Sequence, residues 1–200
     1  MEPTILFRDF EERDVEAIFK WKNDEKLSHM IVGQFHPITY ADAQKWVQGC
    51  MGEHDTYKFW AICTNDDERR IIGWAALAKI DKVNQSAETH SIVIADPEYN
   101  DGIAWIETEF QLLKYAFEEL KLNRLYGVSL VGHKMSNQVG ELLYFKEEGI
   151  LRQACYKNDR FYDLQYIGIL KDEYFAHKEA GDYEMMSVIR RLRKLRKESK

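Results

Sequence analysis

The chain has 200 residues, a formal net charge of −6, 45% hydrophobic and 31% charged residues, and only three prolines. This composition is typical of a globular chain and excludes a largely disordered protein, and no apolar run is long enough for a transmembrane helix. The acidic balance argues against nucleic-acid binding by the main domain, because phosphate neutralisation needs clustered Lys and Arg.

Cysteine usage and the start of the chain bear on the cellular compartment. Cys50, Cys63 and Cys155 are scattered and odd in number, which favours reduced thiols that pack in the interior over a disulfide framework or a zinc site. Residues 1–4 lack the basic and apolar segments of an export signal. We therefore expect a cytoplasmic protein that needs no metal.

Apolar periodicity predicts the secondary structure in chain order. Runs of β-branched or alternating apolar residues predict strands over 5–10, 57–64, 70–81, 87–95 and 124–131. Steps of three and four predict helices over 12–24, from Thr39 with a capping-box Asp42, over 103–120 and over 136–149. A hairpin over 150–170 is expected to turn at Lys157, Asn158 and Asp159. This order predicts a mixed α+β sheet packed by helices.

The end of the chain has a different character. No boundary is evident before about residue 172, so we expect one domain over 1–171 and a basic helical extension over 172–200. Met185, Val188, Leu192 and Leu195 recur there at helical spacing among many Arg and Lys residues. One interpretation is a helix that packs on its own domain or on a twin subunit. The other is contact with an anionic partner such as RNA, a membrane surface or an acidic protein.

Residues 92–110, IVIADPEYNDGIAWIETEF, change from strand to helix within a short turn. The strand breaks at Pro97, the helix begins near Ile103, and Gly102 lies at the junction. Unpaired N–H groups and the macrodipole of a helix N-terminus attract anions, and glycine lets the backbone approach a ligand closely. A pyrophosphate could bind here, although an ordinary turn would look the same. Neither the G-x-G-x-x-G of a Rossmann fold nor the lysine of a P-loop is present.

The element order and several segments resemble the GNAT superfamily of acyl-CoA-dependent N-acyltransferases over about residues 4–171. DPEYNDGIA (96–104) resembles the turn whose amides wrap the CoA pyrophosphate, and SNQVGELLY (136–144) resembles the segment that meets the pantetheine and the thiol. As a whole the chain is most similar to the RimJ/RimL-like branch and to amino-sugar N-acetyltransferases of the pseudaminic acid pathway. The hairpin segment 147–175 and the helical segment IFKWKNDE resemble those of the RimJ/RimL-like branch. The resemblance implies a GNAT fold, with a mostly antiparallel sheet of about seven strands.

The resemblance also implies acetyl-CoA as cosubstrate. The residues expected to contact it are Val93, Ile94, Ala95, Asn100, Asp101, Gly102, Ile103, Ala104, Asn137 and Tyr144. For Asn137 an alternative stays open, because Ser136 is a plausible N-cap and capping alone could explain the Ser-Asn pair.

The implied chemistry is direct transfer of an acetyl group to an uncharged amine. It needs a base, a donor to the oxyanion and a proton for the departing thiolate, but no protein nucleophile. Glu88 and His90 lie two residues apart on the strand before the turn, so they share one face of the sheet. We expect Glu88, with a pKa raised by apolar surroundings, as the first candidate base and His90 as the second. Alternatively, both only line a cleft and water takes the proton.

Two aromatic residues complete the expected site. By its place in the family segment, Tyr144 is the candidate acid to the CoA thiolate, whereas the alternative is that it only packs beside its leucine neighbours. Trp21, on the expected acceptor-side helix, and His90 are the candidate substrate-binding residues.

The first functional hypothesis is acetylation of a small primary amine, such as that of a nucleotide-linked amino sugar. A second is acetylation of a protein N-terminus, an aminoglycoside or a polyamine. A third, of another class, is a non-catalytic acyl-CoA sensor whose basic tail contacts a partner. A homodimer is compatible with all three.

Overall fold

The computed structural model describes residues 3–29, 31–100 and 102–198. Within them, seven strands form one sheet in the order β1-β2-β3-β4-β5-β7-β6. The strands are β1 (Ile5–Arg8), β2 (Lys58–Thr64), β3 (Ile71–Asp81), β4 (Ser86–Ile94), β5 (Arg124–Leu130), β6 (Lys146–Lys157) and β7 (Arg160–Leu170). All described neighbours pair antiparallel except β4 and β5, which are parallel. The predicted α+β class and mostly antiparallel sheet are confirmed.

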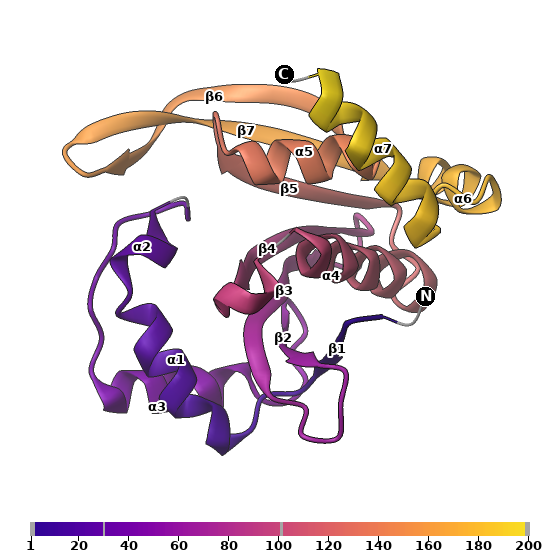
Figure 1. The fold of residues 1–200 in the computed structure, drawn as a ribbon. Coiled ribbons are helices and arrows are strands. Elements are labelled where there is room, and N and C mark those ends of the chain that lie inside the picture. The colour runs from indigo at the N-terminus through magenta and orange to yellow at the C-terminus, as the bar shows by residue number, and fades with distance from the viewer. Residues whose placement is uncertain (1–2, 30, 101, 199–200) are drawn as a thin grey trace.

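Helices cover both faces of this sheet. They are α1 (Val15–Lys22), α2 (Glu25–Ser28), α3 (Tyr40–Cys50), α4 (Ile103–Lys114), α5 (Lys134–Leu142), α6 (Lys171–Glu179) and α7 (Met185–Glu198). Figure 1 shows β1 to β4 with α1 to α3 in one half of the molecule and β5 to β7 with α5 to α7 in the other. The predicted start of α3 is confirmed, since the Asp42 N–H donates to Thr39 Oγ1 at 3.2 Å and the Thr39 N–H donates to Asp42 Oδ2 at 3.0 Å.

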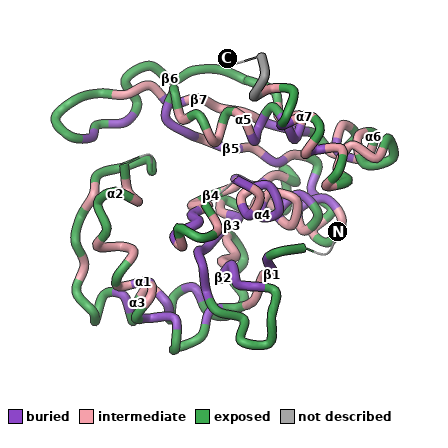
Figure 2. Tube along the Cα trace, viewed as in Figure 1, coloured by how far each residue is buried: buried purple, intermediate pink, exposed green. Residues whose placement is uncertain are grey.

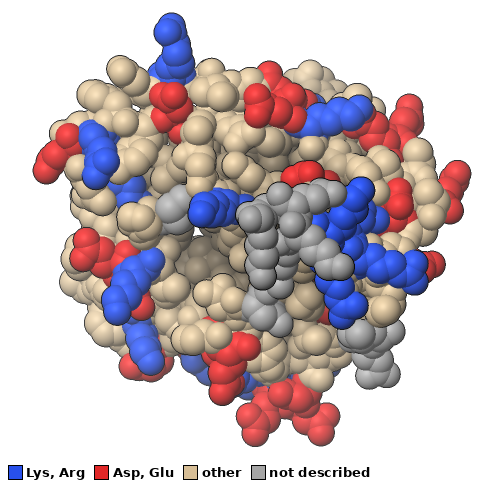
Figure 3. Space-filling model, turned by 45° about the horizontal axis from the view of Figure 1, so that its top comes forward, with Lys and Arg blue, Asp and Glu red and all other residues tan. Residues whose placement is uncertain are grey.

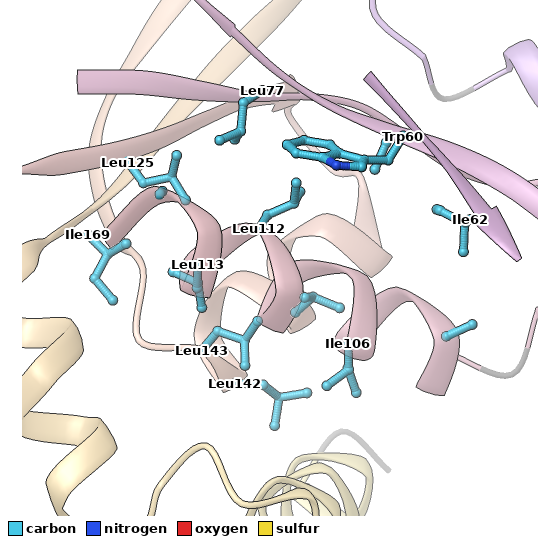
Figure 4. Close-up of a cluster of buried hydrophobic side chains, with 14 of the residues drawn as sticks. Trp60, Ile62, Leu77, Ile106, Leu112, Leu113, Leu125, Leu142, Leu143 and Ile169 are labelled. Atoms are coloured by element: carbon cyan, nitrogen blue, oxygen red, sulfur yellow. The ribbon is translucent and has the colours of Figure 1, made fainter. Parts of the chain in front are cut away.

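Two apolar clusters hold the layers together. Alternate residues of β2 point to opposite faces, so Ile62 joins the larger cluster under α4, whereas Ala61 joins the smaller one under α1 and α3. Figure 4 shows the larger cluster, in which Leu112 and Leu113 of α4 pack between the sheet and α5. Figure 2 shows burial concentrated in the central strands and α4, while β6 runs exposed along the edge.

The helix predicted over 136–149 ends much earlier, so that prediction was wrong. α5 stops at Leu142, and β6 begins at Lys146, which pairs with Gly168 of β7. Tyr144 adopts a left-handed φ of +65°; its N–H donates to the Glu141 carbonyl at 3.3 Å, and the next N–H donates to the Gly140 carbonyl at 2.9 Å. This is a Schellman motif, which normally uses glycine at the left-handed position. With tyrosine there, the stop signal is invisible in the sequence.

The C-terminal helix α7 packs its apolar side on the main domain. Val188 is fully buried and Leu192 is 8% exposed, and both belong to the larger cluster. Arg191 donates to the backbone carbonyls of Leu142 at 3.1 Å and Asp182 at 2.6 Å. The more exposed basic residues of α7 lie among the Lys and Arg side chains that gather to one side of a hollow in Figure 3.

Candidate active site

The sheet splits between its two parallel strands. β4 and β5 pair only from Ser86 opposite Arg124 to Thr89 opposite Gly127, although both strands continue beyond this point. The register of β4 against β3 also shifts before Val93, and Ser91 takes a left-handed φ of +51°. This bulge bends β4 away from β5. The strands therefore diverge (Figure 1). A cleft lies between them.

The cleft has a volume of about 390 Å³ and opens at the molecular surface (Figure 3). Its walls come from Lys79 of β3, from residues 88–92 of β4 and 127–129 of β5, from β7, from the first two turns of α4 and from the start of α5. Ile31 and Val32, in the segment after α2, also line it. Residues distant in the sequence thus converge on one cavity that is mixed in polarity.

Gly102 is the N-cap residue of α4, beside this cleft. It is left-handed, with φ +91° and ψ −14°, a conformation in which any side chain would be strained. A Cβ at this position would also touch the Met135 side chain at 3.6 Å. In the preceding turn Asn100 is exposed, and its N–H donates to the Pro97 carbonyl at 3.3 Å. The predicted contact residue Asp101 lies outside the described residues.

The N-termini of α4 and α5 lie next to each other. The Trp105 ring meets the His133 ring edge-on, with centroids 5.6 Å apart, and Met135 reaches Gly102. Both helices are long enough for their dipoles to add positive potential at this end of the cleft. Lys134, at the first position of α5, is exposed. This corner of the protein suits a pyrophosphate group.

Glu88 and His90 form a hydrogen-bonded pair at the point where the strands part. His90 Nδ1 lies 3.2 Å from Glu88 Oε1, and Lys79 Nζ lies 2.7 Å from Glu88 Oε2. Burial raises the pKa of Glu88, but the hydrogen bonds from His90 and Lys79 outweigh it, so the pKa is lowered overall. The expectation of a raised pKa was wrong, because the sequence did not reveal that Lys79 and His90 both bond to this carboxylate.

Comparison of the chain with known proteins agrees with these features. The family model described as "Acetyltransferase (GNAT) domain" matches residues 4–146. The chain belongs to the GNAT acetyltransferase family. GNAT enzymes are acyl-CoA N-acyltransferases, and the seven-stranded sheet of the described residues is the GNAT fold.

Two relatives from Bacillus subtilis (strain 168) differ in how much of their length the chain matches. "Putative ribosomal N-acetyltransferase YdaF" is 36% identical over 108 residues, which cover 54% of this chain and 58% of that protein. "Uncharacterized N-acetyltransferase YoaA" is 27% identical over 170 residues, which cover 84% of this chain and 93% of that protein. The chain thus matches little more than half the length of YdaF but nearly all of YoaA.

A solved structure supports the fold. The crystal structure of spermidine N-acetyltransferase from Vibrio cholerae, in complex with CoA and spermine, superimposes with a TM-score of 0.75. The match covers 86% of this chain and 98% of that chain at 20% identity, which establishes similarity of fold alone. CoA is therefore bound by a protein of this architecture.

The GNAT cleft does not contain all the residues predicted for it. Tyr144 stacks on His177 with ring centroids 3.6 Å apart, and Arg191 lies 4.9 Å from its ring. Trp21 stacks on Trp74 in the smaller apolar cluster. Neither residue lines the cleft.

Several residues predicted to contact CoA do not line the cleft either. Val93, Ile94 and Ala95 are buried, and the Ala95 N–H already donates to the Ile72 carbonyl at 2.8 Å, so the cleft lining on β4 ends at Ile92. Ala104 is buried and Asn137 is exposed, and neither lines the cleft; the same is true of Ile103, at the start of α4.

Sequence reasoning missed His133. Its side chain, not that of Ser136, is the N-cap of α5, and Nδ1 accepts from the Ser136 N–H at 3.2 Å. Burial lowers the pKa of His133, which keeps the ring neutral with its proton on Nε2. The sequence carries no strong signal for this role, because histidine is an uncommon cap.

The cysteines, the potential metal ligands and the helices of the described residues also bear on what the protein can do. Cys50, Cys63 and Cys155 are buried free thiols, and burial raises the pKa of Cys50 and Cys63. No cluster of three or more His, Cys, Asp or Glu in the described chain could hold a metal ion. Likewise, none of the described helices is long and apolar enough to span a membrane.

Proposed function

We propose that this GNAT protein transfers an acetyl group directly from acetyl-CoA to a primary amine. The observation that carries the proposal is the Glu88–His90 pair, which lies where β4 and β5 part, in the cleft that begins at the N-termini of α4 and α5. The two helix N-termini would hold the pyrophosphate, and the cleft would hold the pantetheine arm. The arm would bring the thioester to His90.

His90 is the proposed base, ahead of Glu88. With Nδ1–H donating to Glu88 Oε1, Nε2 keeps its lone pair for the proton of the amine. Glu88 is a weak base because its pKa is lowered, but its carboxylate can orient the imidazole and stabilise the imidazolium that forms. Lys79 keeps Glu88 charged. This order reverses the ranking drawn from the sequence.

The acceptor we propose is a small primary amine, and a nucleotide-linked amino sugar is one example. The second candidate is the α-amine of a protein terminus, which the similarity to YdaF favours. Polyamines belong to the same chemical class, and the fold neighbour from V. cholerae is named for spermidine. All of these acceptors need an amine that is deprotonated before attack.

Calorimetric titration with acetyl-CoA and with desulfo-CoA tests cofactor binding first. Gly102→Val should abolish binding, because it strains the turn and adds side-chain bulk beside the first amides of α4. Gly52→Val is the matched control, since Gly52 is also left-handed, with φ +87°, but has open space around it. Thiol release with spermidine, glucosamine and a peptide with a free α-amine then tests transfer. A folded wild-type protein that binds no acetyl-CoA would overturn the proposal.

A further inference from the structure

Glu109 places a buried carboxyl oxygen in the cleft. The acetyl transfer proposed above gives this residue no role. It follows Trp105 by one helical turn on α4, and both line the cavity. The residue as a whole is partly exposed, but Oε2 is buried and has no hydrogen-bond partner among the described residues. By contrast, the buried Glu107 accepts hydrogen bonds from Thr4 and Ile5. Glu109 is therefore not needed to tie the fold together.

The surroundings of Glu109 keep it protonated. Burial raises its pKa to about 8, so at neutral pH the group is mainly a neutral carboxylic acid that can donate a proton. The other titratable groups that line the cleft are Lys79, Glu88, His90, His133 and Tyr166. Lys79 and His90 each bond to Glu88, and burial lowers the pKa of His133.

The position of Glu109 along α4 matches the course of a CoA arm. Glu109 is seven residues beyond Gly102, which places it about 10 Å from the helix N-terminus. It shares the cavity lining with Ser91 and Ile92, at and after the β4 bulge. Phosphates held at the N-terminus would lie away from it, whereas the sulfur end of the arm must extend into the cavity that it lines.

We propose that Glu109 in its protonated form is the acid that delivers a proton to the CoA thiolate. The proposal rests on the function proposed above. The amine nitrogen bonds to the carbonyl carbon as the C–S bond breaks, and the sulfur takes the bonding electron pair. The Glu109 carboxyl proton moves to that sulfur, and the amine gives its own proton to His90. His90 then returns a proton to water and Glu109 regains one, so the net products are an amide and CoA thiol.

Glu109→Gln tests this role, with Tyr166→Phe and Tyr144→Phe as matched losses of other acidic protons. In single-turnover assays with the amine that wild type accepts best, Glu109→Gln should slow transfer roughly 10²-fold or more. Its acetyl-CoA affinity should stay within about threefold, as expected for a side chain of the same size. The wild-type rate should fall above about pH 8, and the variant should lack that limb. Wild type should also show the infrared band of a protonated carboxyl group, with a midpoint near pH 8, and Glu109→Gln should not.

The outcomes separate the two proposals. A wild-type protein that binds acetyl-CoA but acetylates no amine overturns the proposed function and this role with it. An active wild type together with a fully active Glu109→Gln overturns the role of Glu109 alone. A loss in Tyr166→Phe or Tyr144→Phe as large as expected for Glu109→Gln, without a loss in Glu109→Gln, would reassign the acid to that tyrosine.

Discussion

His90 Nδ1 lies 3.2 Å from Glu88 Oε1, and the two residues share one face of β4 at the point where the sheet opens. A carboxylate behind an imidazole is the arrangement that orients a base and fixes which ring nitrogen is free. His90 is half-exposed toward the cleft, whereas the Glu88 side chain is only 7% exposed. The exposed partner can meet an amine, and the buried partner can hold it in place.

We predict that His90→Ala lowers kcat by roughly 10² to 10⁴-fold, because it removes the base. Glu88→Gln should lower kcat less, since Gln can still accept a hydrogen bond through its amide oxygen but carries no charge. Steady-state kinetics with the best amine acceptor measures both. Calorimetric acetyl-CoA affinity is the control and should change little in either variant. A fully active His90→Ala would leave water as the base.

The raised pKa of Glu109 predicts how stability depends on pH. In the unfolded chain a glutamate titrates near 4.3, whereas in the folded protein Glu109 titrates at about 8. Between these values the native state holds a proton that the unfolded state has lost, so stability falls as pH rises through this window and levels off above it. Relative to Glu109→Gln, wild type should lose up to about 1.4 kcal/mol per pH unit. Urea unfolding from pH 5 to 8.5 measures the free energy of unfolding of both proteins. If it changed with pH in the same way in wild type and in Glu109→Gln, the prediction would be contradicted.

Lys157 connects the β6–β7 hairpin to the end of α2 and to the segment that follows it. Its side chain is buried, and Nζ donates to the carbonyls of Ser28 at 2.5 Å and Ile31 at 2.7 Å. Because Ile31 and Val32 line the cleft, this clamp shapes one wall of it. The pKa of Lys157 is lowered by burial, which is the cost of placing the ammonium there.

We predict that Lys157→Met costs about 1–3 kcal/mol of stability, since two carbonyls lose their donor. It should also raise KM for the amine while acetyl-CoA affinity is kept, because the helix N-termini that would hold the phosphates are not touched. Arg160→Met, a charge loss on the same hairpin at an exposed position, is the control and should change neither quantity. Equal KM values in the two variants would show that the clamp does not shape the acceptor site.

The sequence was informative where one pattern dominated. The helical apolar repeat predicted α4, and runs of apolar residues predicted β2 and β3, which are buried almost continuously. Gly102 stood out at the junction of strand and helix, and its left-handed φ explains why glycine lies there. The pattern failed where a single residue overrode it, as at Tyr144, which ends α5 without glycine. Glu109 was not among the residues that the sequence predicted for the site. Only the divergence of β4 and β5 places that side of α4 against a cavity.

The apolar and basic sides of α7 should respond differently to mutation. Leu192→Ala should cost about 2–4 kcal/mol, because Leu192 is buried in the larger apolar cluster. Arg190→Ser together with Arg193→Ser should change stability by less than about 0.5 kcal/mol, since both side chains are exposed. Thermal and urea unfolding measure these effects, and light scattering shows whether either variant changes the oligomeric state. If the double arginine variant destabilised the protein as much as Leu192→Ala, the basic side would be part of the folded interior or of a subunit contact, and an anionic partner would not be needed to explain it.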